Sequence, residues 1–107
     1  MTRALLLAVA LAFGATAQAA GNAAAGKAKA QVCAACHGAE GNKPTAPENP
    51  ILAGQHQDYL LKALKDYKSG KRNNPVMKGF AATLSAQDME DLAAWFASQK
   101  SNLHFQR

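Results

Sequence analysis

The stretch VCAACHGAEG at residues 32–41 contains both cysteines of this 107-residue chain. Two residues separate Cys33 from Cys36, and His37 follows directly. Two thiols and an imidazole at this spacing suit three kinds of chemistry: a redox-active disulfide, a metal site, or covalent attachment of a haem whose iron the histidine binds.

The disulfide and the zinc site fit the rest of the chain less well than the haem does. Redox-active C-x-x-C pairs normally sit on a βαβ unit, and no segment here has a convincing strand pattern. Structural zinc needs four ligands, whereas the motif offers three, with Cys36 and His37 awkwardly adjacent. His56 and His104 are isolated. With two intervening residues, both sulfurs lie near one face of a helical turn, from which His37 also presents its ring.

The first twenty residues have the pattern of an export signal. Arg3 precedes an apolar run at positions 4–13, and Ala17-Gln18-Ala19 has the small residues that signal peptidase requires. The run is about half of the roughly 20 residues that span a bilayer. We expect residues 1–20 to be cleaved near Ala19 or Ala20, leaving a soluble periplasmic domain at residues 21–107. Export agrees with the haem, since c-type haem is attached outside the cytoplasm.

The mature chain is predicted to be all-α with long loops. The last helix has the clearest start: Ser85 is a good N-cap, Asp88 completes a capping box, and Leu84 with Met89 forms a hydrophobic staple. Gly70 suits a left-handed cap at the end of the middle helix. Long loops in so small a protein usually wrap around something. The expected helices cover residues 22–31, 58–69 and a segment after Ser85, and the expected loops cover residues 37–54 and 71–83.

The last helix also carries an apolar stripe with helical spacing. Its members are Met89, Leu92, Ala93 and Phe96, joined by Trp95.

The second axial ligand of a haem iron decides what the protein does. Met77 lies in NNPVMKGF, which Pro75 and Gly79 are expected to keep out of regular helix, so its thioether can reach across the haem. Met89 falls on the apolar stripe and is interpreted as a core residue. His56 and His104 remain competing ligands without a supporting context.

The charge pattern argues against nucleic-acid binding. The formal net charge of +5 is modest and dispersed, and no basic run is interleaved with aromatic residues. A basic strip lies on and after the middle helix; it is either an ordinary solvated face or a surface that steers an acidic partner. The strip consists of Lys62, Lys65, Lys68, Lys71 and Arg72.

With these residues placed, the chain resembles the bacterial class I cytochromes c, near the monohaem cytochrome c-553 kind and one half of the two-haem periplasmic cytochromes c. The resemblance covers about residues 21–99. It is carried by VCAACHG, NPILAGQ, YLLKALKDYKSGKR, PVMKGFAATLS and DLAAWFASQ. It implies a small class I fold of three to four helices and long loops around one haem c.

The resemblance also implies roles for individual residues. Cys33 and Cys36 would carry the haem, His37 and Met77 would bind iron, and the Pro50 carbonyl would accept the His37 ring N–H. Arg72 and Lys78 would lie near the haem propionates. Gly26 would let the first helix cross closely against Leu92 and Trp95 of the last helix.

The implied function is one-electron transfer by a monomer that has no substrate chemistry of its own. Its partners would be redox proteins: a membrane oxidase, a quinol-oxidising complex or a dehydrogenase. Two alternatives stay open. One is a haem subunit that serves as the electron port of a larger redox enzyme, and the other is a haem enzyme or gas sensor with an open or displaceable sixth ligand.

Overall fold

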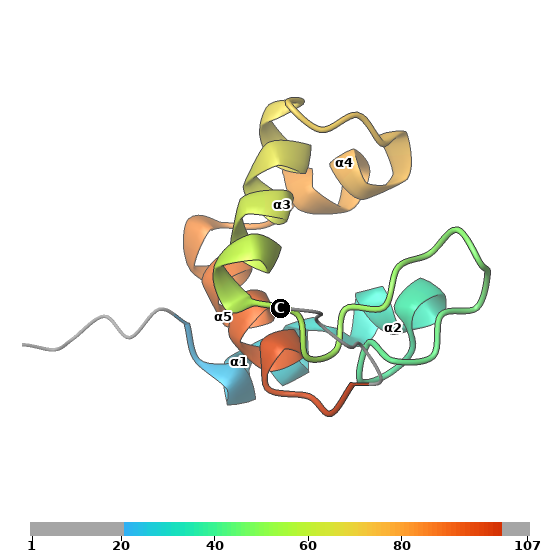
Figure 1. The fold of residues 1–107 in the computed structure, drawn as a ribbon. Coiled ribbons are helices and arrows are strands. Elements are labelled where there is room, and N and C mark those ends of the chain that lie inside the picture. Colours follow the sequence, from blue (N-terminus) through green and yellow to red (C-terminus); the bar gives the residue numbers. More distant parts are fainter. Residues whose placement is uncertain (1–20, 102–107) are drawn as a thin grey trace, which may run out of the picture.

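The computed structural model describes residues 21–101, and within that range it contains helices and no strand (Figure 1). The predicted all-α class is confirmed. The predicted signal peptide at residues 1–20 and the candidate ligand His104 lie outside the described residues. The helices are α1 (Ala23–Lys29), α2 (Gln31–His37), α3 (Gln57–Ser69), α4 (Pro75–Ala82) and α5 (Ala86–Ala97).

The described residues thus form five helices, where three to four were expected. The alanine-rich segment divides at Ala30 into α1 and α2. The loop predicted at residues 71–83 is wrong, because α4 occupies most of it. The Asn74 side chain accepts the N–H of Met77 at 3.1 Å, which caps the first turn. Pro75 follows at the first helical position, where its missing N–H costs nothing and its φ is already helical.

The predicted C-terminal end of α3 and the predicted start of α5 are confirmed. The helix α3 stops at Gly70, whose φ of +84° lies in the left-handed region that glycine adopts without strain. At the start of α5, Ser85 Oγ accepts the N–H of Asp88 and Asp88 Oδ2 accepts the N–H of Ser85, both at 3.0 Å. This capping box fixes the direction in which the last helix enters the fold.

The helices α1 and α5 cross at Gly26. A Cβ on Gly26 would lie 2.0 Å from the carbonyl oxygen of Asp91 and 2.8 Å from Cβ of Trp95. The close crossing predicted at this glycine is therefore present, but its nearest neighbours are Asp91 and Trp95 rather than Leu92 and Trp95. Only a residue without a side chain permits this separation of the two backbones.

A polar cluster fastens the same crossing. Asp91 is 3% exposed, and its carboxylate accepts hydrogen bonds from the Asn22 N–H at 2.8 Å, Lys29 Nζ at 2.6 Å and Gln87 Nε2 at 2.8 Å. Lys29 also pairs with Asp88 at 2.8 Å. The Lys29 ammonium, and then the Asn22 N–H, lower the pKa of Asp91 to about 2. Asp91 is therefore buried as a carboxylate that has partners for its charge.

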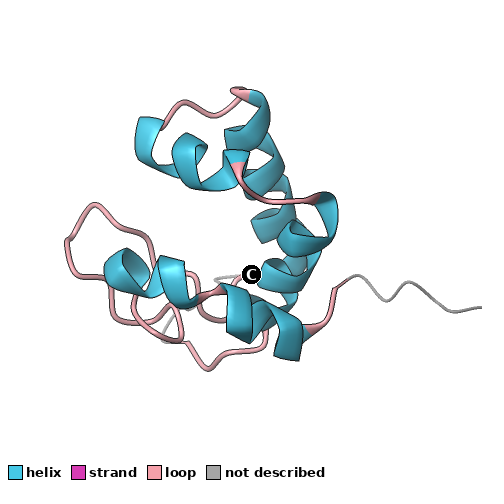
Figure 2. Cartoon of the chain, turned by 180° about the vertical axis from the view of Figure 1, so that it is seen from behind, coloured by secondary structure: helices cyan, strands magenta, loops and turns pink. Residues whose placement is uncertain are grey.

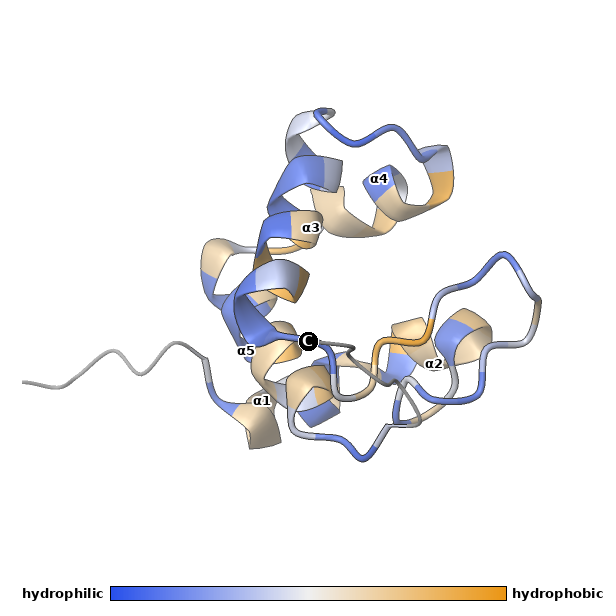
Figure 3. Ribbon diagram, viewed as in Figure 1, coloured by the Kyte–Doolittle hydropathy of each residue, from blue (hydrophilic) through white to orange (hydrophobic). Residues whose placement is uncertain are grey.

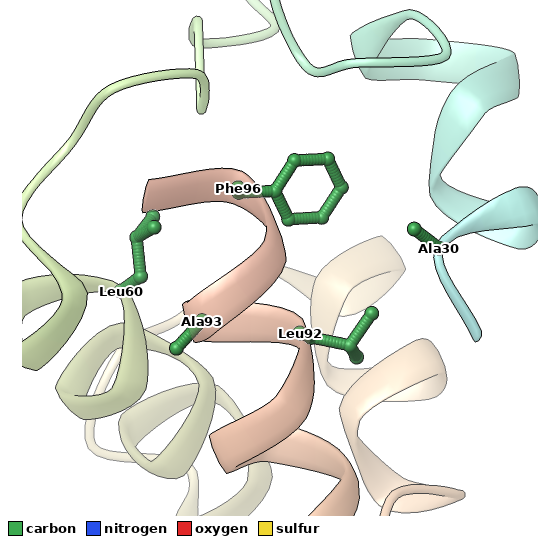
Figure 4. Close-up of a cluster of buried hydrophobic side chains, with 5 residues drawn as sticks. All are labelled: Ala30, Leu60, Leu92, Ala93 and Phe96. Atoms are coloured by element: carbon green, nitrogen blue, oxygen red, sulfur yellow. The ribbon is translucent and has the colours of Figure 1, made fainter. Parts of the chain in front are cut away.

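The apolar core gathers around α5. Figure 4 shows Leu60 of α3 on one side of α5 and Ala30 on the other. The predicted stripe of Met89, Leu92, Ala93 and Phe96 is buried throughout, whereas Trp95 is only partly buried against the core. The cluster of buried apolar residues consists of Ala30, Leu60, Leu92, Ala93 and Phe96.

The helix α4 stands apart from this core. Among the described helices it contacts α3 but not α1, α2 or α5. Figures 1 and 2 show an open, C-shaped arrangement, with α4 on one arm and α2 with the loop that follows it on the other. Figure 3 shows α4 as mainly hydrophobic and α3 as mainly hydrophilic. Within residues 21–101 there is no helix with the length and apolar character needed to cross a membrane.

Candidate functional site

His37 is the last residue of α2 and is 6% exposed. Its ring Nδ1 lies 2.9 Å from the carbonyl oxygen of Pro50. A carbonyl oxygen only accepts, so Nδ1 carries the proton and donates it, and Nε2 is left as the nitrogen with a lone pair. This is the tautomer and the fixed orientation that metal-binding histidines commonly have.

Cys33 and Cys36 lie one helical turn apart on α2, both have intermediate exposure, and no disulfide joins them. Both cysteines and His37 belong to the same short helix, which is the arrangement expected from the C-x-x-C-H spacing.

The loop at residues 38–56 holds the C-terminal end of α2. The Cys36 carbonyl accepts the Thr45 N–H at 3.0 Å and the Asn49 Nδ2–H at 3.2 Å. The Thr45 hydroxyl also donates to the Ala35 carbonyl at 3.3 Å. Sequence reasoning missed Asn49 and Thr45. The signal that could have found them is that the last carbonyls of any helix need partners from outside it.

The same loop is fixed to the core. The Gly41 carbonyl accepts the N–H of Leu52 at 2.7 Å and that of Ala53 at 3.1 Å. A Cβ on Gly41, whose φ is +76°, would lie 2.7 Å from the Phe96 ring. These contacts brace the segment that contains Pro50 against α5.

Met77 lies in the first turn of α4, on the arm opposite α2 (Figure 1). Its side chain is half-buried, four residues before the buried Ala81 on the same helix. Met89 is 5% exposed within α5, so its interpretation as a core residue is confirmed. His56 occupies the N-cap position of α3, at the end of the loop that follows α2, and its role as a competing ligand stays untested.

Arg72 lies in the connection between α3 and α4. Its guanidinium carbon is 4.8 Å from the centroid of the Tyr67 ring, a cation–π geometry. The backbone N–H of Arg72 donates to the Asp66 carbonyl at 3.1 Å. Lys78 is exposed on α4. The predicted nearness of Arg72 and Lys78 to haem propionates stays a prediction.

The donor set fits a covalent haem better than a bare metal ion. Within residues 21–101 no three His, Cys, Asp or Glu side chains gather in a way that would hold a metal ion. Two thiols and one oriented imidazole lie together on α2, and the mainly hydrophobic α4 faces them without touching that helix. A large flat apolar group bound through both sulfurs would supply α4 with a second packing partner besides α3.

Comparison with known proteins agrees with this fit. The cytochrome c family pattern matches residues 23–100. The chain is 55% identical over 101 residues to cytochrome c4 of Pseudomonas aeruginosa, covering 92% of this chain and 50% of that protein. It is 43% identical over 84 residues to cytochrome c-554(548) of Halomonas halodenitrificans, covering 76% of this chain and all of that protein.

A solved structure shows the same fold. The crystal structure of reduced recombinant cytochrome c4 from Pseudomonas stutzeri matches with a TM-score of 0.72 and 47% sequence identity, covering 78% of this chain and 48% of that one. The chain thus spans about half the length of the cytochrome c4 proteins that it matches. The expected covalent haem c is confirmed by the family match, with Cys33 and Cys36 fitting the attachment motif. This chain belongs to the cytochrome c family and is similar to one half of a cytochrome c4.

Proposed function

We propose that the chain is a periplasmic one-electron carrier whose haem c is attached through Cys33 and Cys36 and whose iron is bound by His37 and Met77. The observation that carries this proposal is the position of the two candidate ligands. His37 has its ring fixed by Pro50 on one arm, and Met77 lies on α4, on the other arm. The haem iron supplies the one-electron couple, and a methionine in the sixth position raises its potential and keeps dioxygen away.

The protein residues give this couple a fixed environment. The Pro50 carbonyl holds the His37 ring in one orientation and makes it a stronger donor. The capped first turn of α4 holds the backbone of Met77. Ligands that stay in place in both oxidation states keep the geometry nearly constant, so little rearrangement accompanies electron transfer.

Electrons would enter and leave beside the attachment motif. Ala34 is half-buried and Ala35 is exposed, and both have small side chains between the two cysteines. A partner surface can approach closely there. The partners that we propose are redox proteins: a membrane oxidase, a quinol-oxidising complex or a dehydrogenase. Arg72 and Lys78 would assist by lying near the haem propionates.

The ligand assignment is tested with visible spectra of the haem-loaded protein, produced in a host that attaches haem in the periplasm. We expect a c-type spectrum with a weak far-red sulfur–iron band in the oxidised wild type. The band should vanish in Met77→Ala. The matched control is Met89→Leu, since Met89 is buried in the core and its replacement should leave the band in place.

Two other outcomes would change the proposal. A band that survives Met77→Ala would exclude Met77 as the ligand. Strong carbon monoxide binding by the reduced wild type would indicate an open or easily displaced sixth position, and with it an enzyme or sensor rather than a carrier. The mass of the exported protein locates the signal-peptide cleavage, and co-purification separates a free monomeric carrier from a subunit of a larger enzyme.

A further inference from the structure

The dipeptide Asn49–Pro50 contacts two consecutive residues of the haem-binding motif. The Asn49 side chain donates to the Cys36 carbonyl at 3.2 Å, and the Pro50 carbonyl lies 2.9 Å from Nδ1 of His37. We propose that Asn49 is a positioning residue for the axial histidine: it fixes the Pro50 carbonyl against the His37 ring and so sets the reduction potential. This inference rests on the proposed function, in which His37 binds the haem iron.

The contact joins two segments that must keep their relative position. Cys36 and His37 end α2, where backbone carbonyls have no partner within the helix. Asn49 supplies one such partner from the loop. Because Asn49 and Pro50 are adjacent, the same hydrogen bond restricts how far the Pro50 carbonyl can move from the imidazole.

The neighbouring loop contacts do not replace this one. Thr45 reaches the end of α2 through its N–H and its hydroxyl, but it lies five residues before Pro50. Leu52 and Ala53 fasten the far side of the segment to the Gly41 carbonyl. Between these anchors, in the part of the loop next to Pro50, the Asn49 amide reaches the haem-binding helix. Its side chain is half-buried, so water competes with it only in part.

The chemical consequence concerns the donor strength of the imidazole. A ring N–H that donates to a carbonyl makes the opposite nitrogen a better donor, which favours ferric iron over ferrous. Loosening the Pro50 carbonyl would weaken that hydrogen bond. The reduced state would then be favoured, and the reduction potential would rise.

The test compares Asn49→Leu with Thr45→Val, both as exported, haem-loaded proteins. Leucine keeps the approximate shape of asparagine without a donor, and Thr45→Val removes hydroxyl contacts at the same helix end while keeping the backbone N–H. We expect Asn49→Leu to shift the electron-exchange equilibrium with a reference carrier threefold to tenfold toward the reduced protein, tenfold corresponding to about 59 mV for one electron. Thr45→Val should shift it less than twofold.

A second measurement reports on the hydrogen bond itself. In the reduced, diamagnetic protein, the His37 Nδ1 proton should exchange with solvent about tenfold faster in Asn49→Leu than in the wild type or in Thr45→Val. The smaller variant Asn49→Ser, whose hydroxyl is too short to replace the amide, should change both measurements in the same direction.

Three results would overturn the inference. The first is an unchanged reduction potential and an unchanged proton-exchange rate in Asn49→Leu. The second is a Thr45→Val variant whose effects equal those of Asn49→Leu. The third is failure of both Asn49 variants to take up haem while Thr45→Val succeeds, which would give Asn49 a role in folding instead. Failure of the proposed function looks different. If the wild type has no far-red band, Met77 is excluded as the iron ligand, but the comparison of Asn49→Leu with Thr45→Val at His37 stays valid. A wild type without covalent haem excludes both proposals.

Discussion

The crossing of α1 with α5 and the docking of α4 are stabilised in different ways. At the crossing, two backbones approach so closely that Gly26 has no room for a Cβ, and the buried Asp91 carboxylate binds groups from α1 and α5. The helix α4 contacts only α3 among the described helices, and its Val76 is 62% exposed and its Phe80 44% exposed. One region is stabilised by its own contacts, and the other leaves apolar surface uncovered.

This difference indicates how the fold and the cofactor share the stabilisation. A domain of this size buries a modest apolar core, and small domains usually need an additional partner. Here the α1–α5 crossing anchors the start of α2, and thereby the haem-binding motif, through contacts between protein groups. The helix α4, with the proposed ligand Met77, would gain its missing packing from the haem. Perturbations of the two regions should therefore differ in kind.

The largest effect is expected from Gly26→Ala. Alanine normally stabilises a helix interior relative to glycine by about 1 kcal/mol. At Gly26 the new Cβ would lie 2.0 Å from the Asp91 carbonyl oxygen, so α1 and α5 must separate. We expect a loss of about 3 kcal/mol in the free energy of unfolding, measured by denaturant titration.

The matched control for that substitution is Gly79→Ala in α4. A Cβ on Gly79 would meet nothing within 4 Å, so the same change should be neutral or stabilise by about 0.5 kcal/mol. Equal losses at Gly26 and Gly79 would contradict the proposed difference between the two regions.

The next effect concerns Asp91, which should make the crossing sensitive to acid. The pKa of Asp91 is about 2 in the folded protein and about 4 in an unfolded chain, so its contribution to stability is complete above pH 4 and is lost as the pH falls toward 2. We expect Asp91→Asn to lower the free energy of unfolding by about 2 kcal/mol at pH 7. The difference from the wild type should shrink below pH 4, while Glu40→Gln, at an exposed loop carboxylate, should change little at either pH.

The bond between Met77 and the haem iron is expected to hold α4 in place. In the haem-loaded protein, Met77→Ala should speed hydrogen exchange of the α4 amides about tenfold, equivalent to about 1.4 kcal/mol of local stability. The α5 amides should keep their wild-type rates, because the core around Leu92 and Phe96 does not involve Met77. Slower or unchanged exchange in α4 would show that its contact with α3 is sufficient to hold it.

The sequence predicted the α5 region better than the loops, for physical reasons. The capping box at Ser85 and the stripe from Met89 to Phe96 depend on local spacing, and both were confirmed. No local pattern indicates that Asp91, which lies between stripe members in the sequence, is buried, because the partners that make its burial favourable come mainly from α1 and its N-cap. The helix α4 was missed because Pro75 was interpreted as a helix breaker, although proline is favoured at the first helical position.

The candidate site divides in the same way. The attachment motif and His37 were found because their spacing carries the chemistry, and the Pro50 carbonyl was placed by resemblance to a family. Asn49 and Thr45 were not found, since their role depends on how a loop folds back onto the end of α2. Contacts of this kind become visible only when the partners of each helix carbonyl are known.

The smallest effects are expected from removing one helix cap in each region. Asn74→Ala before α4 and Ser85→Ala before α5 each delete a side chain that accepts an N–H of the first turn. Each should lower the free energy of unfolding by about 1 kcal/mol.

The consequences of the two substitutions for the haem should differ. The N–H that Asn74 caps belongs to Met77, so Asn74→Ala should also increase carbon monoxide binding to the reduced protein several-fold by loosening the sixth ligand. Ser85→Ala should lower the denaturation midpoint alone, because α5 carries no proposed iron ligand. If the two variants bind carbon monoxide equally, Met77 is held by the haem iron and the contacts of α4 rather than by its cap.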